Sequence, residues 1–321
     1  MLQIGYHVSH EQFSPKDLLS YVQLAEKKGF QFAMSSDHFY PWSESQGHSG
    51  HAWTWLGAAL AKTNFPIGVV NCPCYRYHPA IIAQAIATLG TMFPDRFWVA
   101  FGSGQMLNEG VIGSKWPTKQ KRNEILKDAI GVIRQLLNGE EVNFSGSFEL
   151  HEAKLYTLPP SPSEIIGAAI TPETAGFICE CTDGLITVNQ PLEKLEKVRQ
   201  AWHGAGGEKK SMTLKLQVSY DPSHEVATKG AFEQWKTNIF GSEMLTQLRT
   251  PKHFEQAAVH VTEADMKDYV LIGNDPNFFV EKILTCYKLG FSRIDIHNVN
   301  KNQEAFIHFF AEKVLPKLKV K

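Results

Sequence analysis

Short apolar stretches alternate along the chain with segments whose apolar residues recur every three or four positions. The first pattern is typical of buried strands and the second of amphipathic helices. Strands are predicted at residues 2–8, 30–36, 66–71, 96–101, 164–169, 184–188, 212–220 and 293–297. Helices are predicted between them: from Pro15 to near Gly29, at 54–63, at 79–93, from about 125 to near Gly139, from Pro172, from about 192, at 275–289 and at 302–315.

Eight strands that alternate with helices predict a parallel sheet. Eight such units in 321 residues favour a closed (β/α)8 TIM barrel over an open doubly wound sheet. We expect a single α/β domain over residues 1–321, with a longer mixed insertion at about 222–268. In such a barrel the site lies at the carboxyl ends of the strands and on the loops that follow them.

The composition is that of an ordinary globular protein, with 43% hydrophobic and 20% charged residues and a net charge of −1. No basic field predicts a nucleic acid or membrane partner, and no run of 18 apolar residues predicts a membrane span. The sequence starts on a strand without the pattern of a signal peptide, so we expect a cytoplasmic enzyme. The predicted partner is a small-molecule substrate.

Two features invite a metal hypothesis that we do not favour. The five cysteines include two Cys-x-Cys pairs, Cys72 with Cys74 and Cys179 with Cys181. The second pair lies in a predicted helix, where positions i and i+2 do not share a face, so apolar packing is the better interpretation. His48 and His51 follow His38 without a carboxylate at ligand spacing, which favours a solvated loop. We therefore predict no metal.

Three costly residue types follow the second strand: Asp37, His38 and Trp42. In a barrel they fall on the catalytic rim, where His38 could move a proton, Asp37 could orient it and Trp42 could form a wall. The alternative is a capped loop with a packed tryptophan, and position alone does not decide between them.

The next three strands also end in suggestive loops. Arg76, after the third strand, could bind an anion or pair with a carboxylate. Gly102 and Gly104, after the fourth, would let the backbone approach a flat ligand, although no dinucleotide fingerprint follows. Residues 168–171 lead from the fifth strand into a helix whose amino terminus suits a phosphate, or they form a plain turn.

Six ordered motifs carry a resemblance to a known family. They are Glu11-Gln12-Phe13, Ser36-Asp37-His38-Phe39-x-Pro41-Trp42, Gln46-Gly47-His48, Tyr75-Arg76-Tyr77-x-Pro79-Ala80-x-Ile82-Ala83-Gln84-Ala85, Gly102-Ser103-Gly104 and Leu107-Asn108-Glu109. Together they resemble the luciferase-like family of flavin- and F420-dependent oxidoreductases, and most closely its F420-dependent glucose-6-phosphate dehydrogenase group. The resemblance runs from Leu2 to about Val188 and again over the seventh and eighth strands.

The resemblance implies a flavin-like ring at the barrel mouth, a homodimer, and a non-prolyl cis peptide bond near residues 69–71. It implies that the catalytic residues are His38, Trp42, Asp37 and Gln105, with Glu11, Trp42 and Gln105 at the substrate. It implies that the cofactor contacts Asp37, His38, Val70, Asn71, Gly104, Asn108, Ala168, Ala169, Ile170 and Thr171.

Two departures from the dehydrogenase pattern bear on the substrate. Gln105 stands where those enzymes have an acid, and an amide cannot exchange a proton at useful pH; Glu109 or Glu11 could compensate. Gln256 stands where a lysine is expected, leaving only Lys194 or Lys197 as loose candidates for a sugar phosphate. Glucose 6-phosphate is therefore not the expected substrate.

The sequence thus predicts hydride transfer between a flavin-type cofactor and a small organic substrate, with His38 moving the hydroxyl proton. The cofactor is FMN or coenzyme F420, with FMN slightly favoured because both dehydrogenase hallmarks are missing. An FMN-dependent luciferase-like monooxygenase and a non-catalytic flavin-binding protein are the alternatives.

Overall fold

A closed parallel barrel forms the centre of the computed structural model, which describes residues 1–318. The barrel strands are β1 (Gln3–Val8), β2 (Phe32–Ser36), β3 (Ile67–Asn71), β4 (Phe97–Phe101), β7 (Glu164–Ala168), β8 (Gly184–Val188), β9 (Ser211–Tyr220) and β11 (Arg293–Asn298). β9 pairs with β8 on one side and β11 on the other, and β11 pairs with β1, so no barrel strand is left at an edge. The prediction of a (β/α)8 barrel is confirmed.

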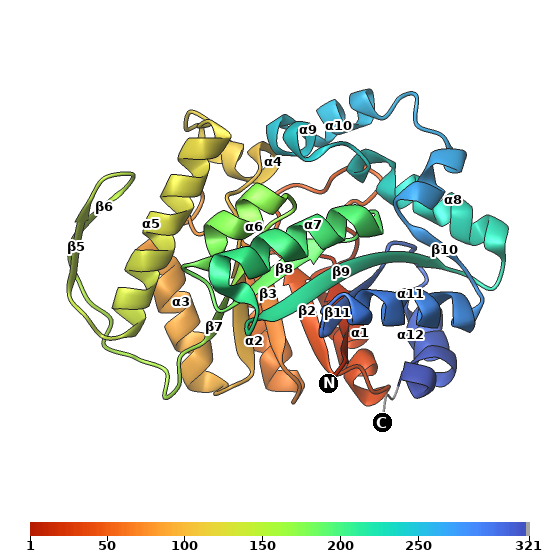
Figure 1. The fold of residues 1–321 in the computed structure, drawn as a ribbon, viewed down its shortest axis with the longest axis horizontal. Coiled ribbons are helices and arrows are strands. Elements are labelled where there is room, and N and C mark those ends of the chain that lie inside the picture. The colour runs from red at the N-terminus through yellow and green to blue at the C-terminus, as the bar shows by residue number, and fades with distance from the viewer. Residues whose placement is uncertain (319–321) are drawn as a thin grey trace.

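Helices surround the barrel (Figure 1). The longer ones are α1 (Pro15–Lys27), α2 (Ala52–Lys62), α3 (Pro79–Met92), α5 (Lys119–Leu137), α6 (Pro172–Cys179), α7 (Leu192–Trp202), α8 (His224–Trp235), α11 (Pro276–Lys288) and α12 (Gln303–Phe309). Short helices are α4 (Met106–Glu109), α9 (Ser242–Gln247) and α10 (Pro251–Ala257). In Figure 1, α9 and α10 lie over the end of the barrel opposite the N-terminus.

Helix starts follow the capping rules that the sequence suggested. The side chains of Ser14 and Thr171 accept hydrogen bonds from the backbone N–H groups three residues on, and a proline follows each cap. α2 starts two residues before the predicted position because His51 serves as its cap, accepting from the N–H of Thr54. His51 therefore has a structural role in this loop.

Three strands outside the barrel were not predicted. β5 (Val142–Ser145) and β6 (Glu149–Ala153) form a hairpin that projects beyond α5 in Figure 1. β10 (Leu271–Gly273) adds to β9 outside the barrel. β5 and β6 are short and largely polar, so their sequences carry little of the apolar pattern that marks a buried strand. β10 has only three residues, too few to form a recognisable strand pattern.

The prediction of a cis peptide bond near residues 69–71 is wrong for this structure. All peptide bonds of the described residues are trans. The backbone at residues 69–71 continues as a regular ladder, with Val69, Val70 and Asn71 paired in register with β4. Unbroken pairing on this side holds the segment in the ordinary extended conformation.

The interior of the barrel is divided into an apolar half and a polar half. Strands β2, β4, β7 and β8 supply the apolar half: Phe32, Met34, Trp98, Ala100, Ile166 and Ile186. Strands β1, β9 and β11 supply the polar half: His7, Lys215, Gln217, Asp295 and His297. Parallel register keeps residues of neighbouring strands at one level, as with Lys215 and Asp295, so the polar side chains meet one another.

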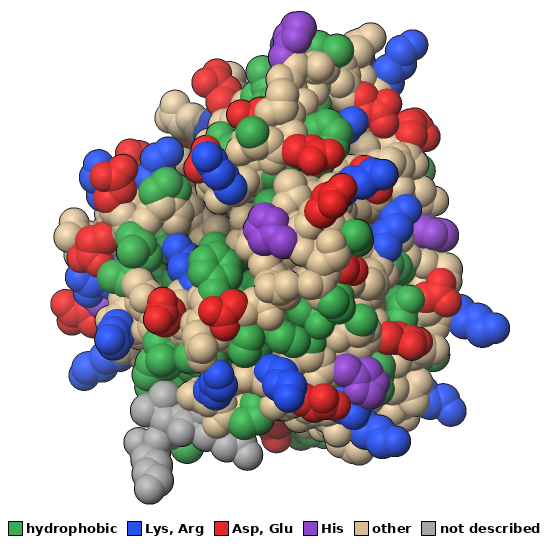
Figure 2. Space-filling model, turned by 90° about the vertical axis from the view of Figure 1, so that its right-hand side faces the viewer, with side chains coloured by type: hydrophobic (Ala, Val, Ile, Leu, Met, Phe, Trp, Pro, Cys, Tyr) green, Lys and Arg blue, Asp and Glu red, His purple; other side chains and the backbone are tan. Residues whose placement is uncertain are grey.

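Charges on the outer surface are mixed. On the face that carries α8 and α11, acidic and basic side chains are interspersed (Figure 2). Within residues 1–318 no helix is long and apolar enough to cross a membrane.

Glycines leave space for aromatic rings inside the barrel. Gly68 of β3 lies in register with Trp98 of β4, and Gly5 of β1 with Phe32 of β2. A β-carbon at either glycine would overlap the ring of its partner. The two bulky rings can therefore fill the barrel only because the neighbouring strands carry glycine.

We predict that Gly68→Ala destabilises the protein by about 1–3 kcal/mol, because the added methyl forces Trp98 out of its packed position. Urea unfolding measures the change. The control is Gly131→Ala, at an exposed position of α5 with open space around its Cα, where alanine should gain about 0.5–1 kcal/mol. Equal effects at the two glycines would contradict the packing argument.

Candidate active site

The carboxyl ends of the strands open into a cavity of about 690 Å³. Among its lining residues are twelve of the thirteen predicted site residues: Asp37, His38, Trp42, Val70, Asn71, Gly104, Gln105, Asn108, Ala168, Ala169, Ile170 and Thr171. The thirteenth, Glu11, lies buried beside His38. Ser242, Glu243, Thr246 and Gln247 place α9 over the same cavity.

His38 is a partly buried imidazole, 14% exposed, whose charged partner is Glu11. Its Nε2 lies 3.4 Å from the Glu11 carboxylate, which also accepts hydrogen bonds from the hydroxyls of Ser36 (2.6 Å) and Ser9 (2.9 Å). Burial lowers the pKa of His38, although the Glu11 charge opposes this. The ring is therefore neutral near pH 7 and can accept a proton.

Asp37 is not the partner of His38 that we expected. Its carboxylate accepts from the Asn71 amide, from the Arg76 guanidinium at 3.0 Å and from the Tyr77 hydroxyl at 3.3 Å. All three donors follow or end β3, so Asp37 ties the second rim loop to the third. Arg76 thus pairs with carboxylates, the second of its two proposed roles.

Glu109 shares Arg76 with Asp37. Its carboxylate accepts from the Arg76 backbone N–H at 3.2 Å and lies 3.8 Å from the guanidinium Nε. Burial raises the pKa of Glu109 to about 7, and Arg76 opposes this shift only in part. With a pKa of about 7, Glu109 is partly protonated at neutral pH. It also lines the cavity.

Trp42 is positioned by the helices that follow β9. Its ring packs edge-on against Phe254 of α10, with ring centroids 5.2 Å apart. Its backbone N–H donates to the side chain of Gln46 at 2.8 Å, and Gln46 in turn donates to the carbonyl of Gln234 at 3.0 Å. The sequence marked Gln46 only as part of a motif, and its link to α8 was not foreseen.

One part of the cavity wall is shaped for a flat ring with a phosphate. Gly104 has a φ of 82°, and a β-carbon there would crowd the Cys72 sulfur and Glu109, each at 3.0 Å. Ala168 and Ala169 present only methyl groups. Thr171 caps α6, whose first turn offers backbone N–H groups that lack helical acceptors. These residues fit a flavin or deazaflavin.

The polar half of the barrel forms the other side of the cavity, and the sequence analysis missed it. The Nδ1 of His7 lies 2.8 Å from Asp295, and the Nε2 of His297 lies 2.8 Å from the Gln12 amide oxygen. A signal was present: polar residues alternate with Ile294 and Ile296 in the last strand, so both polar side chains point to the interior. His7 and Lys215 line the cavity itself.

The cysteines are free thiols. Cys72 and Cys74 pack with Ile125 and Ala129, and the thiol of Cys179 contacts the carbonyl of Trp202. Over residues 1–318, no group of three or more His, Cys, Asp or Glu side chains is arranged to hold a metal ion.

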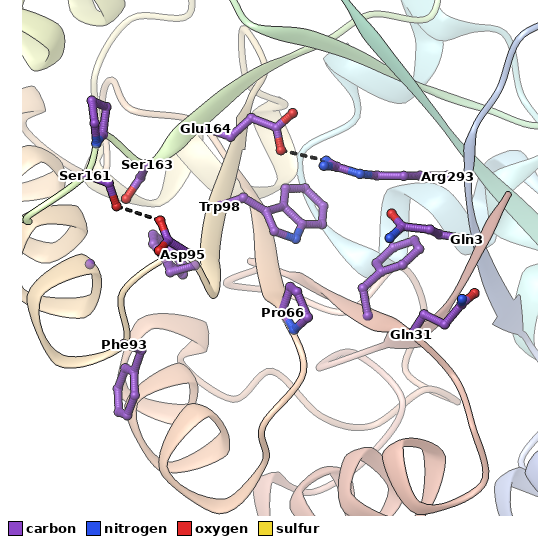
Figure 3. Close-up of a pocket in the computed structure, with 14 residues that line it drawn as sticks. Gln3, Gln31, Pro66, Phe93, Asp95, Trp98, Ser161, Ser163, Glu164 and Arg293 are labelled. Atoms are coloured by element: carbon purple, nitrogen blue, oxygen red, sulfur yellow. Dashed lines mark hydrogen bonds and ion pairs between the residues drawn. The ribbon is translucent and has the colours of Figure 1, made fainter. Parts of the chain in front are cut away.

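A second cavity, of about 250 Å³, lies at the opposite end of the barrel, where the strands begin. Figure 3 shows the Trp98 indole between Pro66 and an ion pair of Glu164 with Arg293. The pair measures 2.6 Å and joins β7 to β11 across the barrel. In a TIM barrel the residues at this end contribute to stability, whereas catalytic residues lie at the carboxyl ends of the strands.

A (β/α)8 barrel with a neutral histidine, buried carboxylates and a cradle for a flat ring at its carboxyl end defines a cofactor-dependent barrel enzyme. The model of the luciferase-like monooxygenase family matches residues 2–293, and the chain belongs to this family.

Relatives with named activities match almost the whole chain. An F420-dependent glucose-6-phosphate dehydrogenase of Beutenbergia cavernae is 34% identical, over 100% of this chain and 98% of its own. One of Mycobacterium tuberculosis is 31% identical, over 99% and 98%. A solved F420-dependent secondary alcohol dehydrogenase, in complex with an F420-acetone adduct, has a TM-score of 0.92 and 29% identity over 99% of both chains.

More distant structures share the fold alone. The oxygenating constituent of 3,6-diketocamphane monooxygenase from Pseudomonas putida, in complex with FMN, has a TM-score of 0.72 and 14% identity, over 99% of both chains. The chain is therefore an oxidoreductase of the luciferase-like family, and its relatives at 30% identity or more are named as F420-dependent enzymes. The slight preference for FMN is not supported, since FMN occurs only among the distant neighbours.

We predict that Glu109→Gln flattens the dependence of stability on pH. A carboxyl whose pKa is about 7 when folded and 4.5 otherwise stabilises the fold while protonated. That contribution is complete below pH 4.5 and is lost as the pH rises to 7, a change of roughly 2–3 kcal/mol.

Urea unfolding at pH 5 and pH 8 tests this. Relative to the wild type, the Glu109→Gln variant should become more stable at the higher pH by about that amount. Glu141→Gln, at an exposed carboxyl, serves as the control and should follow the wild type. A variant that keeps the wild-type slope would show that Glu109 stays ionised in the fold.

Proposed function

We propose that this enzyme transfers a hydride between coenzyme F420 and the carbinol carbon of a small secondary alcohol, or the carbonyl carbon of the matching ketone. The observation that carries the proposal is His38, a neutral and partly buried imidazole beside Glu11. It lies on the wall of the cavity that also holds the residues suited to a flat ring, Gly104, Ala168, Ala169 and Thr171. The likeness to dehydrogenases that use F420, one of them with a secondary alcohol, supports it.

Glucose 6-phosphate is not the substrate we propose. Lys194 and Lys197 are exposed on α7 and do not line the cavity, and Gln256 is exposed on α10. These three positions therefore supply no cation to the cavity, whose lining cations are Lys119, Arg122 and Lys215. The fold alone supports an FMN monooxygenase. A non-catalytic flavin-binding protein would not need the neutral His38 beside Glu11 in the cavity.

When bound, F420 supplies a ring that accepts or gives a hydride. This chain supplies the proton chemistry around it. The neutral His38 accepts the hydroxyl proton of the alcohol, and the Glu11 carboxylate at 3.4 Å stabilises the imidazolium that results. Gln105 caps α4 without a side-chain hydrogen bond, so its amide is free to orient the substrate oxygen.

Other residues hold this arrangement in place. Trp42 lies against the His38 ring at 5.1 Å and shields it from water, while α9 covers the cavity. The Asp37–Arg76–Glu109 network fixes the rim loops. The amide N–H of Asn71 donates to Asp37. The Asn71 amide oxygen has no partner among the described residues and can accept a hydrogen bond from a ligand.

We predict that His38→Ala loses about 10²–10⁴ in turnover with F420 and secondary alcohols, because the positioned base is removed. Binding of F420, followed by its absorbance, should be kept. His48→Ala, at an exposed histidine of the same rim loop, is the matched control and should retain turnover.

The cofactor is tested with the same proteins. We expect F420 to bind and to be reduced by a panel of secondary alcohols, whereas FMN should give no turnover. Activity with FMN alone, or His38→Ala turnover equal to that of the wild type, would contradict the proposed function.

A further inference from the structure

Lys215 is a cation on the cavity wall for which the proposed chemistry has no use. It lies on β9, in register with Asp295 of β11 and Val188 of β8, and its side chain lines the cavity. Its ammonium group makes no hydrogen bond and no ion pair within residues 1–318. The ring of Trp235 lies 5.5 Å from its Nζ.

The two carboxylates that act on Lys215 already have other donors. Glu11 accepts from Ser36 and Ser9 and faces His38. Asp295 bonds to His7 through Oδ2, and its Oδ1 has no hydrogen-bond partner among the described residues. Burial lowers the pKa of Lys215, and these two charges oppose the shift. The Lys215 ammonium is open to the cavity, so an acceptor that enters there can take its N–H groups in place of water.

The place of Lys215 in the barrel points to the substrate as that acceptor. The cradle for the ring comes from β3, β4 and β7, whereas β9 lies across the barrel from β3. Lys215 belongs to the polar half of the barrel, which includes β1, and the loop after β1 carries the Glu11 that faces His38. It therefore lies on the side where the hydroxyl proton is removed.

We propose that Lys215 binds a carboxylate of the substrate, and that the substrate is therefore a short hydroxy acid or the matching oxo acid. This inference rests on the proposed function. In oxidation, the C–H electron pair leaves as hydride to oxidised F420, the O–H proton passes to His38, and a carbonyl forms beside the unchanged carboxylate. One lysine flanked by Glu11 and Asp295 suits a monoanion better than a phosphate dianion.

The first test compares hydroxy acids with their neutral amides. Wild-type enzyme with F420 should oxidise lactate or 3-hydroxybutyrate with a kcat/KM about 100-fold above that of the corresponding amide, because the amide leaves the charge unpaired. Lys215→Met should lose this preference because its kcat/KM for the acid falls, while its kcat/KM for the amide changes less than about tenfold. Lys215→Arg should keep it, and Lys229→Met, at an exposed lysine of α8, should match the wild type.

The second test needs no turnover. Calorimetric titration of the F420-loaded protein with isobutyrate, which cannot be oxidised at a hydroxyl, should show binding to the wild type and none to Lys215→Met. F420 affinity should be equal in the two proteins.

The outcomes separate the two proposals. If neutral alcohols reduce F420 through His38 but isobutyrate does not bind, or if Lys215→Met keeps the preference for acids, the Lys215 site is refuted and the proposed function stands. If isobutyrate binds through Lys215 but no alcohol or hydroxy acid reduces F420, the proposed function is refuted and the anion site stands. A loss of F420 affinity in Lys215→Met would assign the lysine to the cofactor and refute the inference.

Discussion

The pairing of β9 with both β8 and β11 is the contact on which the site depends. Closure brings the carboxyl ends of all eight barrel strands to one mouth, so residues as distant in sequence as Glu11, Gln105 and Lys215 border a single cavity. It also divides the interior by strand. The half built from β2, β4, β7 and β8 packs like a core, and the half built from β1, β9 and β11 holds buried polar groups that need partners.

Those partners explain how so many ionisable groups are tolerated inside one barrel. Buried charges are costly unless they are paired or neutralised. Asp37 is paired with Arg76, Glu109 is partly protonated at neutral pH, and the His7 and His297 rings are kept neutral by burial. Two charged groups differ from these: Lys215 faces the cavity without an ion-pair partner among residues 1–318, and the Glu11 carboxylate lies beside a neutral imidazole, where it can stabilise the proton that the imidazole takes up.

Much of this arrangement could be predicted from local sequence, and the rest could not for a physical reason. The eight barrel strands and the Ser14 and Thr171 caps are set by neighbours within a few residues, so pattern and spacing were enough. The partner of His38 could not be predicted in this way. Glu11 comes from the loop after β1, and Asp37 instead accepts hydrogen bonds from residues at the end of β3 and after it. The hydrogen bond from Gln46 to Gln234 of α8 and the polar half of the barrel likewise depend on contacts between segments that only the closed sheet brings together.

The central claim is that neutral His38, supported by Glu11, receives the substrate proton. The pH dependence of kcat/KM for alcohol oxidation tests it most directly in the wild type and in Glu11→Gln. The Glu11 charge raises the pKa of His38, as Asp37 also does, while Lys215 and Arg76 lower it. Removing the Glu11 charge should therefore move the acid limb of the profile to lower pH and reduce the plateau. An acid limb at the same pH in both proteins would contradict the account.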